Sequence, residues 1–284
     1  MAAAPRPVSV LPPGLPPSAA PTRGARRRGQ VALCARLALR GPLAWISVAI
    51  AGVTVFGAVV VTLTVAHEGP NAPLTALPSL TAGALAWGAG VLLAFASGAH
   101  ALQRDVTEGI RALLVARGGS LRAYAFARVG GLAAVLAAIL GGGTAVAGVV
   151  ATLAASKLGL AAATLQATVG SVAYGFAFAA VIAPIAVAAL GARSRSGGYG
   201  WLLVVLVMPE LFSRWTARAL PHAWRELVSV PSALAALRAS LLPPGIDVAR
   251  FARAAIVLVI VFVVAMLVVH REVARVGNER QPRP

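Results

Sequence analysis

The chain has 284 residues, of which 59 % are hydrophobic and only 12 % are charged, whereas soluble domains have about 45–50 % apolar and about 25 % charged residues. This composition excludes a soluble globular domain and indicates an all-α integral membrane protein. The net charge of +17 would point to nucleic-acid binding in a soluble protein. Here the arginines flank apolar runs, where they set membrane topology and contact anionic lipid headgroups. We therefore expect a lipid bilayer, and no nucleic acid, among the partners.

The N-terminal region divides into two parts. Residues 1–24 are rich in Ala, Pro and Ser, cannot bury enough apolar surface to fold, and are predicted to be a disordered cytoplasmic tail. In residues 25–41, apolar residues alternate with Arg36 and Arg40, which predicts an interfacial helix lying on the cytoplasmic leaflet. Because Cys34 is the only cysteine, an intrachain disulfide and a thiolate metal cluster are excluded. It is expected to face lipid or to pack on this helix.

Six predominantly apolar runs follow that could cross or nearly cross a bilayer core of about 30 Å; the fifth contains Glu210, and the sixth is fully apolar from Ala254 to Val269. They lie near residues 43–66, 77–99, 126–155, 161–191, 198–213 and 248–270. The sequence therefore predicts six transmembrane helices in one domain over residues 42–275, followed by a cytoplasmic tail over 276–284. The fourth run is long enough for a re-entrant pair of helices, but Pro184 is explained more simply as a kink in one long helix.

The distribution of basic residues predicts the topology. With the N-terminus inside, most of the 25 Lys and Arg residues lie on the cytoplasmic side, which places both termini in the cytoplasm. The exception is the basic segment 214–253, which we expect to form short helices that dip into the outer interface.

Small residues are concentrated in the third run. These glycines are Gly130, Gly131, Gly141, Gly142, Gly143 and Gly148. Close contact between helices in lipid depends on such residues, so this span is expected to pack tightly against a neighbour.

The segment 104–120 interleaves acids, arginines and apolar residues between two long uncharged runs. Its apolar residues recur at helical spacing on one side and charged residues cover the rest, which predicts a short amphipathic helix. The glycine pair at 118–119 ends this helix. Ser120 is placed to cap the next helix by accepting the backbone N–H of Arg122 or Ala123.

This pattern resembles the cytoplasmic loop between the second and third spans of ABC-2-type transporter permeases. In that loop an acid, a glycine, a leucine pair, a turn, a serine, a tyrosine and a basic residue follow one another. The matching residues here are Asp105 or Glu108, Gly109, Leu113, Leu114, Gly118, Ser120, Tyr124 and Arg128. The family often has proline in the turn, where this chain has two glycines.

The resemblance implies the transmembrane subunit of an ATP-binding-cassette exporter in the bacterial cytoplasmic membrane. It also implies an elbow helix before the first span, a re-entrant helical piece before the sixth, a second permease subunit in a homo- or heterodimer, and a separate ATPase that binds ATP and Mg²⁺. The implied ATPase-coupling residues are Arg104, Asp105, Glu108, Gly109, Ile110, Leu113, Leu114, Gly118 and Ser120. An ordinary basic loop, in which Glu108 pairs with Arg104 and Arg111, is the alternative.

No catalytic, metal or cofactor site is predicted in this chain. The four histidines fall at different ends of the predicted spans, not at metal-ligand spacing. A phosphate-binding loop needs a lysine after a glycine-rich turn, but the only lysine, Lys157, follows Ala-Ala-Ser. Energy from ATP would therefore have to come from another polypeptide.

Candidate pathway residues are few and mildly polar, and they suit lipids, drugs or polysaccharides alike. They are Thr54, Thr144, Gln166, Ser171, Tyr174 and Glu210. Glu210 is either an interfacial acid paired with Arg214 or a group at the outer mouth of the pathway.

Two other functions stay open from the sequence. An ion-coupled carrier needs ionisable groups in mid-membrane, whereas the first four runs, past Arg128 at the start of the third, contain no charged residue. A membrane scaffold or assembly factor without transport activity is the second alternative.

Overall fold

The computed structural model describes residues 23–68, 73–98, 120–190, 203–212, 227–243 and 245–278, together with residues 200, 215, 221 and 224. Every regular element within these residues is helical, which confirms the all-α prediction. The elements are α1 (Arg23–Ala38), α2 (Pro42–Val65), η1 (Ala66–Glu68), α3 (Leu77–Ala84), η2 (Leu85–Gly90), α4 (Val91–Gly98), α7 (Leu121–Ser156), α8 (Ala161–Leu190), η3 (Leu203–Val207), α10 (Met208–Leu211), α12 (Val230–Ser240) and α13 (Val248–Asn278).

Five helices are long and apolar enough to cross a membrane, so by length and composition the chain is a multi-pass membrane protein. They span Pro42–Val65, Leu77–Gly98, Leu121–Ser156, Ala161–Ala189 and Val248–Arg271. A sixth span was predicted near 198–213. Its described part is η3 with α10, which is too short to cross a core of about 30 Å at about 1.5 Å per residue. The count of six stays a prediction.

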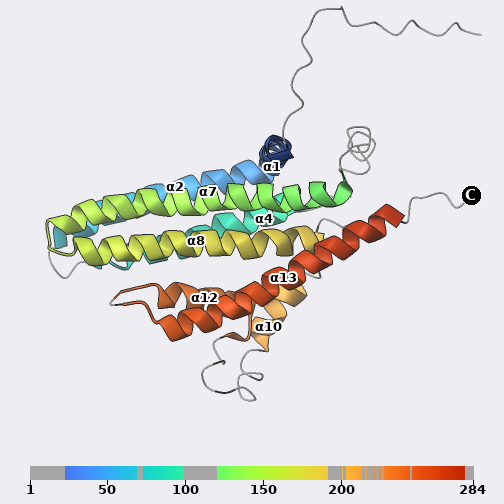
Figure 1. Ribbon diagram of the computed structural model, residues 1–284. Coiled ribbons are helices and arrows are strands. Elements are labelled where there is room, and N and C mark those ends of the chain that lie inside the picture. Colours follow the sequence, from blue (N-terminus) through green and yellow to red (C-terminus); the bar gives the residue numbers. More distant parts are fainter. Residues whose placement is uncertain are drawn as a thin grey trace, which may run out of the picture.

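Helix α8 forms the centre of the bundle. Within its apolar window 67 % of the residues are buried, against 17 % for α2 and 22 % for α13. It runs beside α7 in the opposite direction, and α13 crosses it on the other side (Figure 1). Helix α8 continues without interruption through Pro184, so the alternative of a re-entrant pair is wrong.

Glycines of α7 allow its neighbours to approach closely, as predicted. A Cβ at Gly131 would lie 2.7 Å from the backbone of Cys34 in α1, and one at Gly148 would overlap Thr168 of α8. Not every glycine of this run is in close contact, because Gly142 faces open space and a Cβ at Gly130 would meet only Val31 at an ordinary 3.7 Å.

Helix α1 lies crosswise to the bundle, since Figure 1 shows it nearly end-on while α2 and α7 run across the picture. It begins two residues before the predicted boundary of 25. The chain then turns at Gly41, whose φ of 141° favours glycine, and Pro42 starts α2 at a position where its missing N–H costs nothing. Cys34 is buried with Tyr124 and Ala127 of α7, so it packs within the protein.

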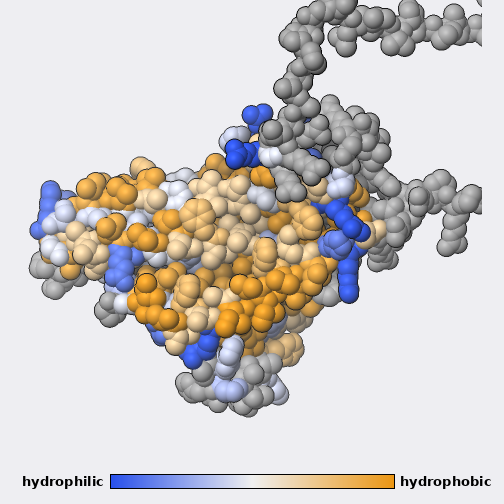
Figure 2. All heavy atoms as spheres, viewed as in Figure 1, coloured by the Kyte–Doolittle hydropathy of each residue, from blue (hydrophilic) through white to orange (hydrophobic). Residues whose placement is uncertain are grey.

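One end of the bundle gathers the end of α1, the end of α4 and the start of α7. The Ser97 hydroxyl donates a hydrogen bond to the Ala38 carbonyl there. On the face visible in Figure 2, apolar side chains cover the middle, and hydrophilic ones gather near the ends. This banding suits a bundle that crosses a bilayer.

Helices α12 and α13 form the last helical pair. Helix α12 packs against both α13 and α8, and its Ala233 and Leu234 are fully buried. It lies alongside α13 in Figure 1. The segment 214–253, which was predicted to form short helices, thus contains the short helix α12, and this helix packs on two spanning helices.

The predicted tails fall mostly outside the described residues. This holds for residues 1–22 and for 279–284. Arg23 and Gly24, assigned to the tail by the sequence, belong to α1, and the last span extends as α13 to Asn278, beyond the predicted domain boundary of 275.

Candidate functional site

A serine at the start of α12 joins this helix to α10. The Ser229 hydroxyl accepts the backbone N–H of Ser232 at 3.0 Å, while the Ser232 hydroxyl accepts that of Ser229 at 3.0 Å, which makes a reciprocal N-cap. The Ser229 hydroxyl also donates a hydrogen bond to the Glu210 carboxylate. A negative charge at a helix N-terminus is favourable because it faces the positive end of the helix dipole. Glu210 therefore stabilises the start of α12.

The apolar stripe of α12 carries one cation, Arg238, one helical turn beyond the fully buried Leu234. Its guanidinium carbon lies 5.8 Å from the ring centroid of Tyr174 in α8, within the range of a cation–π contact. On the other side its Nη1 rests on Gly83 of α3, in the space that a Cβ would occupy. Arg238 thus extends from α12 between two spanning helices.

Trp87 approaches the same place from the second spanning helix. It belongs to η2, a π-helical turn within an otherwise α-helical span. Such turns are rare in proteins overall, and many of those known lie at functional sites. Its ring meets Phe178 edge to face, with centroids 5.5 Å apart at 86°. Phe178 in turn contacts Tyr174 at 6.2 Å between centroids. Trp87 therefore borders the site, and the buried rings of Phe178 and Tyr174 pack behind it.

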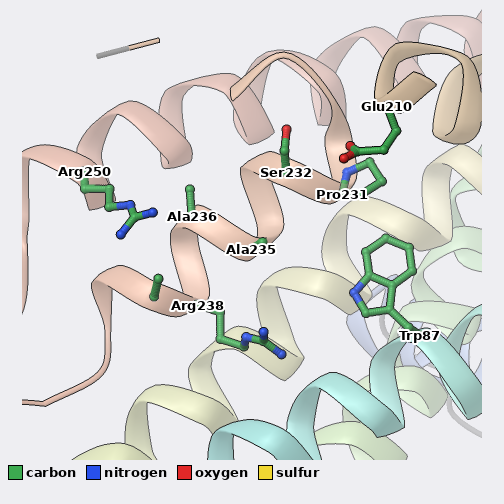
Figure 3. Close-up of a pocket in the computed structure, with 9 residues that line it drawn as sticks. Trp87, Glu210, Pro231, Ser232, Ala235, Ala236, Arg238 and Arg250 are labelled. Carbon is green, nitrogen blue, oxygen red and sulfur yellow. The ribbon is translucent and has the colours of Figure 1, made fainter. Parts of the chain in front are cut away.

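These groups border a cavity of about 610 Å³ between the end of α10, α12, the start of α13 and η2. It is lined by Trp87, Glu210, Pro231, Ser232, Ala235, Ala236, Arg238, Ala239 and Arg250. Figure 3 shows Arg238 and Arg250 on one side, with Trp87 and Glu210 on the other. Arg250 is held at the start of α13, where Asp247 accepts its backbone N–H at 2.9 Å.

The cavity reaches the middle of the spanning helices. At 1.5 Å per residue, Trp87 lies about 15 Å from the Leu77 end of its helix, and Tyr174 lies about 20 Å from the Ala161 end of α8. Both distances fall near the midplane of a core of about 30 Å. The Arg238 guanidinium lies between Tyr174 and Gly83, and Gly83 is about 9 Å from the Leu77 end, so this cation is within the core. Charged residues inside the core are costly and commonly mark substrate or ion pathways.

The predicted pathway residues divide between this cavity and the helix interfaces. Glu210 lines the cavity and Tyr174 contacts Arg238 beside it. The Thr54 hydroxyl donates to the Ile50 carbonyl of its own helix at 2.8 Å, and Gln166 is half-buried in α8.

The last two predicted pathway residues are fully buried in the interior. They are Thr144 of α7 and Ser171 of α8. Among the described residues neither hydroxyl has a hydrogen-bond partner, and neither residue lines the cavity.

Sequence reasoning missed Trp87, Arg238 and Arg250 as members of a site. It treated Arg238 and Arg250 only as topology signals in a basic outer segment. The signal for Arg238 was present, because Leu234, Arg238 and Leu241 fall at i, i+4 and i+7 on one face of an amphipathic helix. A cation in the middle of an apolar stripe indicates a polar partner or a ligand facing that stripe.

The predicted coupling segment lies outside the described residues except for its last residue. Ser120 caps α7 by accepting the Ala123 backbone N–H at 3.1 Å, which confirms the predicted cap. In the described part of the chain, no group of three or more His, Cys, Asp or Glu residues could hold a metal ion.

Comparison with known protein families, with curated proteins and with solved structures finds no match for this chain. The resemblance of residues 104–128 to ABC-2-type permeases therefore stays a prediction from those residues.

Proposed function

We propose that this chain is the transmembrane subunit of an ATP-binding-cassette exporter of the ABC-2 type, driven by a separate ATPase. The observation that carries the transport part is the cavity of about 610 Å³ with Arg238 and Glu210 in its lining. It lies between helices of a membrane bundle and reaches the depth of Trp87. Charged groups on a cavity inside a membrane bundle commonly mark a substrate or ion pathway.

Three features support the ABC-2 part of the proposal. The first is the segment 104–128, with its acid, glycine, leucine pair and capping serine. The second is the crosswise helix α1 before α2, in the place of an elbow helix. The third is α12, a short packed helix directly before α13, in the place of a re-entrant piece before the last span.

The geometry favours ATP-driven transport over proton coupling. Arg238 is the cation that lies over the Tyr174 ring, and a guanidinium keeps its proton throughout the physiological pH range. Glu210, which could exchange a proton, already accepts a hydrogen bond at the start of α12. A proton-coupled carrier would need a titrating group where this site has a permanent charge.

The proposal includes the assembly and its place in the cell. Two such subunits, identical or different, would face each other in the bacterial cytoplasmic membrane, with both termini and the segment 104–120 on the cytoplasmic side. Twofold assemblies are the commonest among oligomers. Two ATPase subunits would bind beneath and carry the ATP and Mg²⁺.

Purification of the tagged chain from its native membrane tests the proposal. We expect a second polypeptide with a phosphate-binding loop to copurify in equal amount, and the complex to hydrolyse ATP. A stable, active complex without any ATP-hydrolysing chain would contradict the proposal and would favour the scaffold or the ion-coupled carrier.

A further inference from the structure

From the geometry of this cavity we infer that it is a binding site for the anionic oxyanion headgroup of a lipid-like amphiphile, with Arg238 as the recognition residue. That the amphiphile is the transported substrate rests on the proposed function. The binding of the amphiphile is independent of the proposed function, because binding requires neither ATP nor the ATPase.

The side chain of Arg238 points into the cavity (Figure 3). Its backbone belongs to a helix that buries Ala233, Leu234 and Leu237, yet its guanidinium lines the cavity. No carboxylate in the described part of the chain forms a salt bridge with it, and its charge is faced by the ring of Tyr174. A ring face leaves the in-plane N–H donors of a guanidinium available, and those donors match the oxygens of a phosphate or carboxylate.

The charged groups of the lining leave room for an anion. The described lining carries two guanidinium groups, Arg238 and Arg250, and one carboxylate, Glu210. That carboxylate accepts the Ser229 hydroxyl at the N-terminus of α12, where the helix dipole also stabilises it. In the described lining, Glu210 is thus engaged with α12 and not with Arg238, and an anionic ligand would neutralise the Arg238 charge.

The uncharged walls of the cavity indicate what the rest of the ligand is. Apart from its charged groups the cavity is bordered by Trp87, Ala235, Ala236 and Ala239. At the depth of Trp87 the surroundings of the bundle are acyl chains. An anion that carries apolar chains can contact both the guanidinium and these walls, whereas a free anion gains nothing from the walls. The site therefore fits an amphiphile better than a soluble anion.

The structure offers a precise way to displace the guanidinium. Alanine at Gly83 would place its Cβ where Arg238 Nη1 lies. A flexible guanidinium can move aside while the helix remains, and alanine is also the better helix former. Alanine at Gly88 is the matched control, since its Cβ would meet only Ile50 at an ordinary 3.9 Å.

The experiment uses Trp87 as the reporter. In the full chain the other four tryptophans are replaced by Phe; these are Trp45, Trp201, Trp215 and Trp224. This protein is purified together with any polypeptide that copurifies and is placed in nanodiscs of phosphatidylcholine. Brominated phosphatidylglycerol or brominated phosphatidylcholine is then added in steps, because bromine quenches tryptophan emission on contact. Half-maximal quenching should need about tenfold less phosphatidylglycerol than phosphatidylcholine, as expected for one charge-assisted contact.

The variants decide what causes that preference. Arg238→Gln and Gly83→Ala should abolish it, whereas Gly88→Ala should keep it. Arg253→Gln, which removes a positive charge from α13 outside the cavity lining, should keep it as well. Loss of the preference in Arg253→Gln to the same degree would overturn the inference, because general surface charge would then explain the binding.

Two further outcomes would overturn it. Equal quenching by the two lipids in the protein with Arg238 intact would show that the cavity does not select anions. Displacement of brominated phosphatidylglycerol by millimolar inorganic phosphate would assign the site to a soluble oxyanion instead of an amphiphile. Each variant's gel-filtration profile and circular dichroism should match the parent, and Gly83→Ala provides a second route to the same loss if Arg238→Gln fails to fold.

Discussion

A few side chains determine how the short helices attach to the bundle, and Ser229 shows this most directly. Its hydroxyl caps α12 and at the same time donates to Glu210 in α10. Loss of a serine N-cap costs about 0.5–2 kcal/mol. Replacing Ser229 would also remove the hydrogen-bond donor to the Glu210 carboxylate. Stability should therefore depend on the charge of the side chain at position 229 as well as on its capping ability.

The substitutions Ser229→Asn and Ser229→Asp separate these two properties. Both residues are good N-caps in general, but aspartate would place a second carboxylate beside Glu210, and like charges at contact distance repel. We expect the apparent melting temperature in detergent at pH 7 to be near the parent value for Asn and clearly lower for Asp. Equal stability of the two variants at pH 7 would show that Glu210 does not act at this position.

At the level of elements, long uncharged runs predicted the spanning helices well. Helix α8 was expected near 161–191 and spans Ala161–Leu190, because the run is bounded by a turn on one side and by charged residues on the other. The end of α13 was predicted too early. An apolar run marks the part of a helix that suits the membrane, whereas the helix itself continues through Arg271 to Asn278.

Close contact between α1 and α7 gives a prediction that the single cysteine can report. Alanine at Gly131 would bring its Cβ to 2.7 Å from the backbone of Ala35 and of Cys34. Because backbone cannot move aside as a side chain can, α1 should separate from α7 and expose Cys34, which is now fully buried. Labelling by N-ethylmaleimide should become about tenfold faster, as for a shift of about 1.4 kcal/mol in a local opening equilibrium.

The neighbouring glycine provides the control for that measurement. Alanine at Gly130 would meet only Val31, at 3.7 Å, which is an ordinary contact. Labelling of Cys34 in Gly130→Ala should match that of the parent protein. If both variants label at the parent rate, α1 does not depend on close approach at Gly131.

For the whole molecule, the sequence predicted where the helices lie along the chain but not which of their side chains meet at the site. Apolar length and basic flanks predict which segments are helices and which ends they share. They carry no information about which helix face meets which neighbour. Arg238 and Tyr174 are distant in sequence and come together only because α12 packs against α8. For this reason the sequence did not predict Arg238 as a pathway residue, although it did predict Glu210 and Tyr174.

We propose that energy reaches this bundle from a separate ATPase through the segment 104–120. If that segment inserts into a cleft of the ATPase, a bulky side chain at Gly109 should hold it away, although leucine is the better helix former by roughly 0.5–1 kcal/mol. The measurement is the amount of ATPase that copurifies with Gly109→Leu from the native membrane, with the open-space variant Gly142→Ala as the control.

We predict that Gly109→Leu inserts and dimerises normally but loses the ATPase or separates its ATP hydrolysis from transport, and that Glu108→Arg does the same, while Gly142→Ala behaves as the parent protein. A Gly109→Leu variant that retains the ATPase in full amount and transports normally would contradict the account, because the segment 104–120 would then be an ordinary solvated loop.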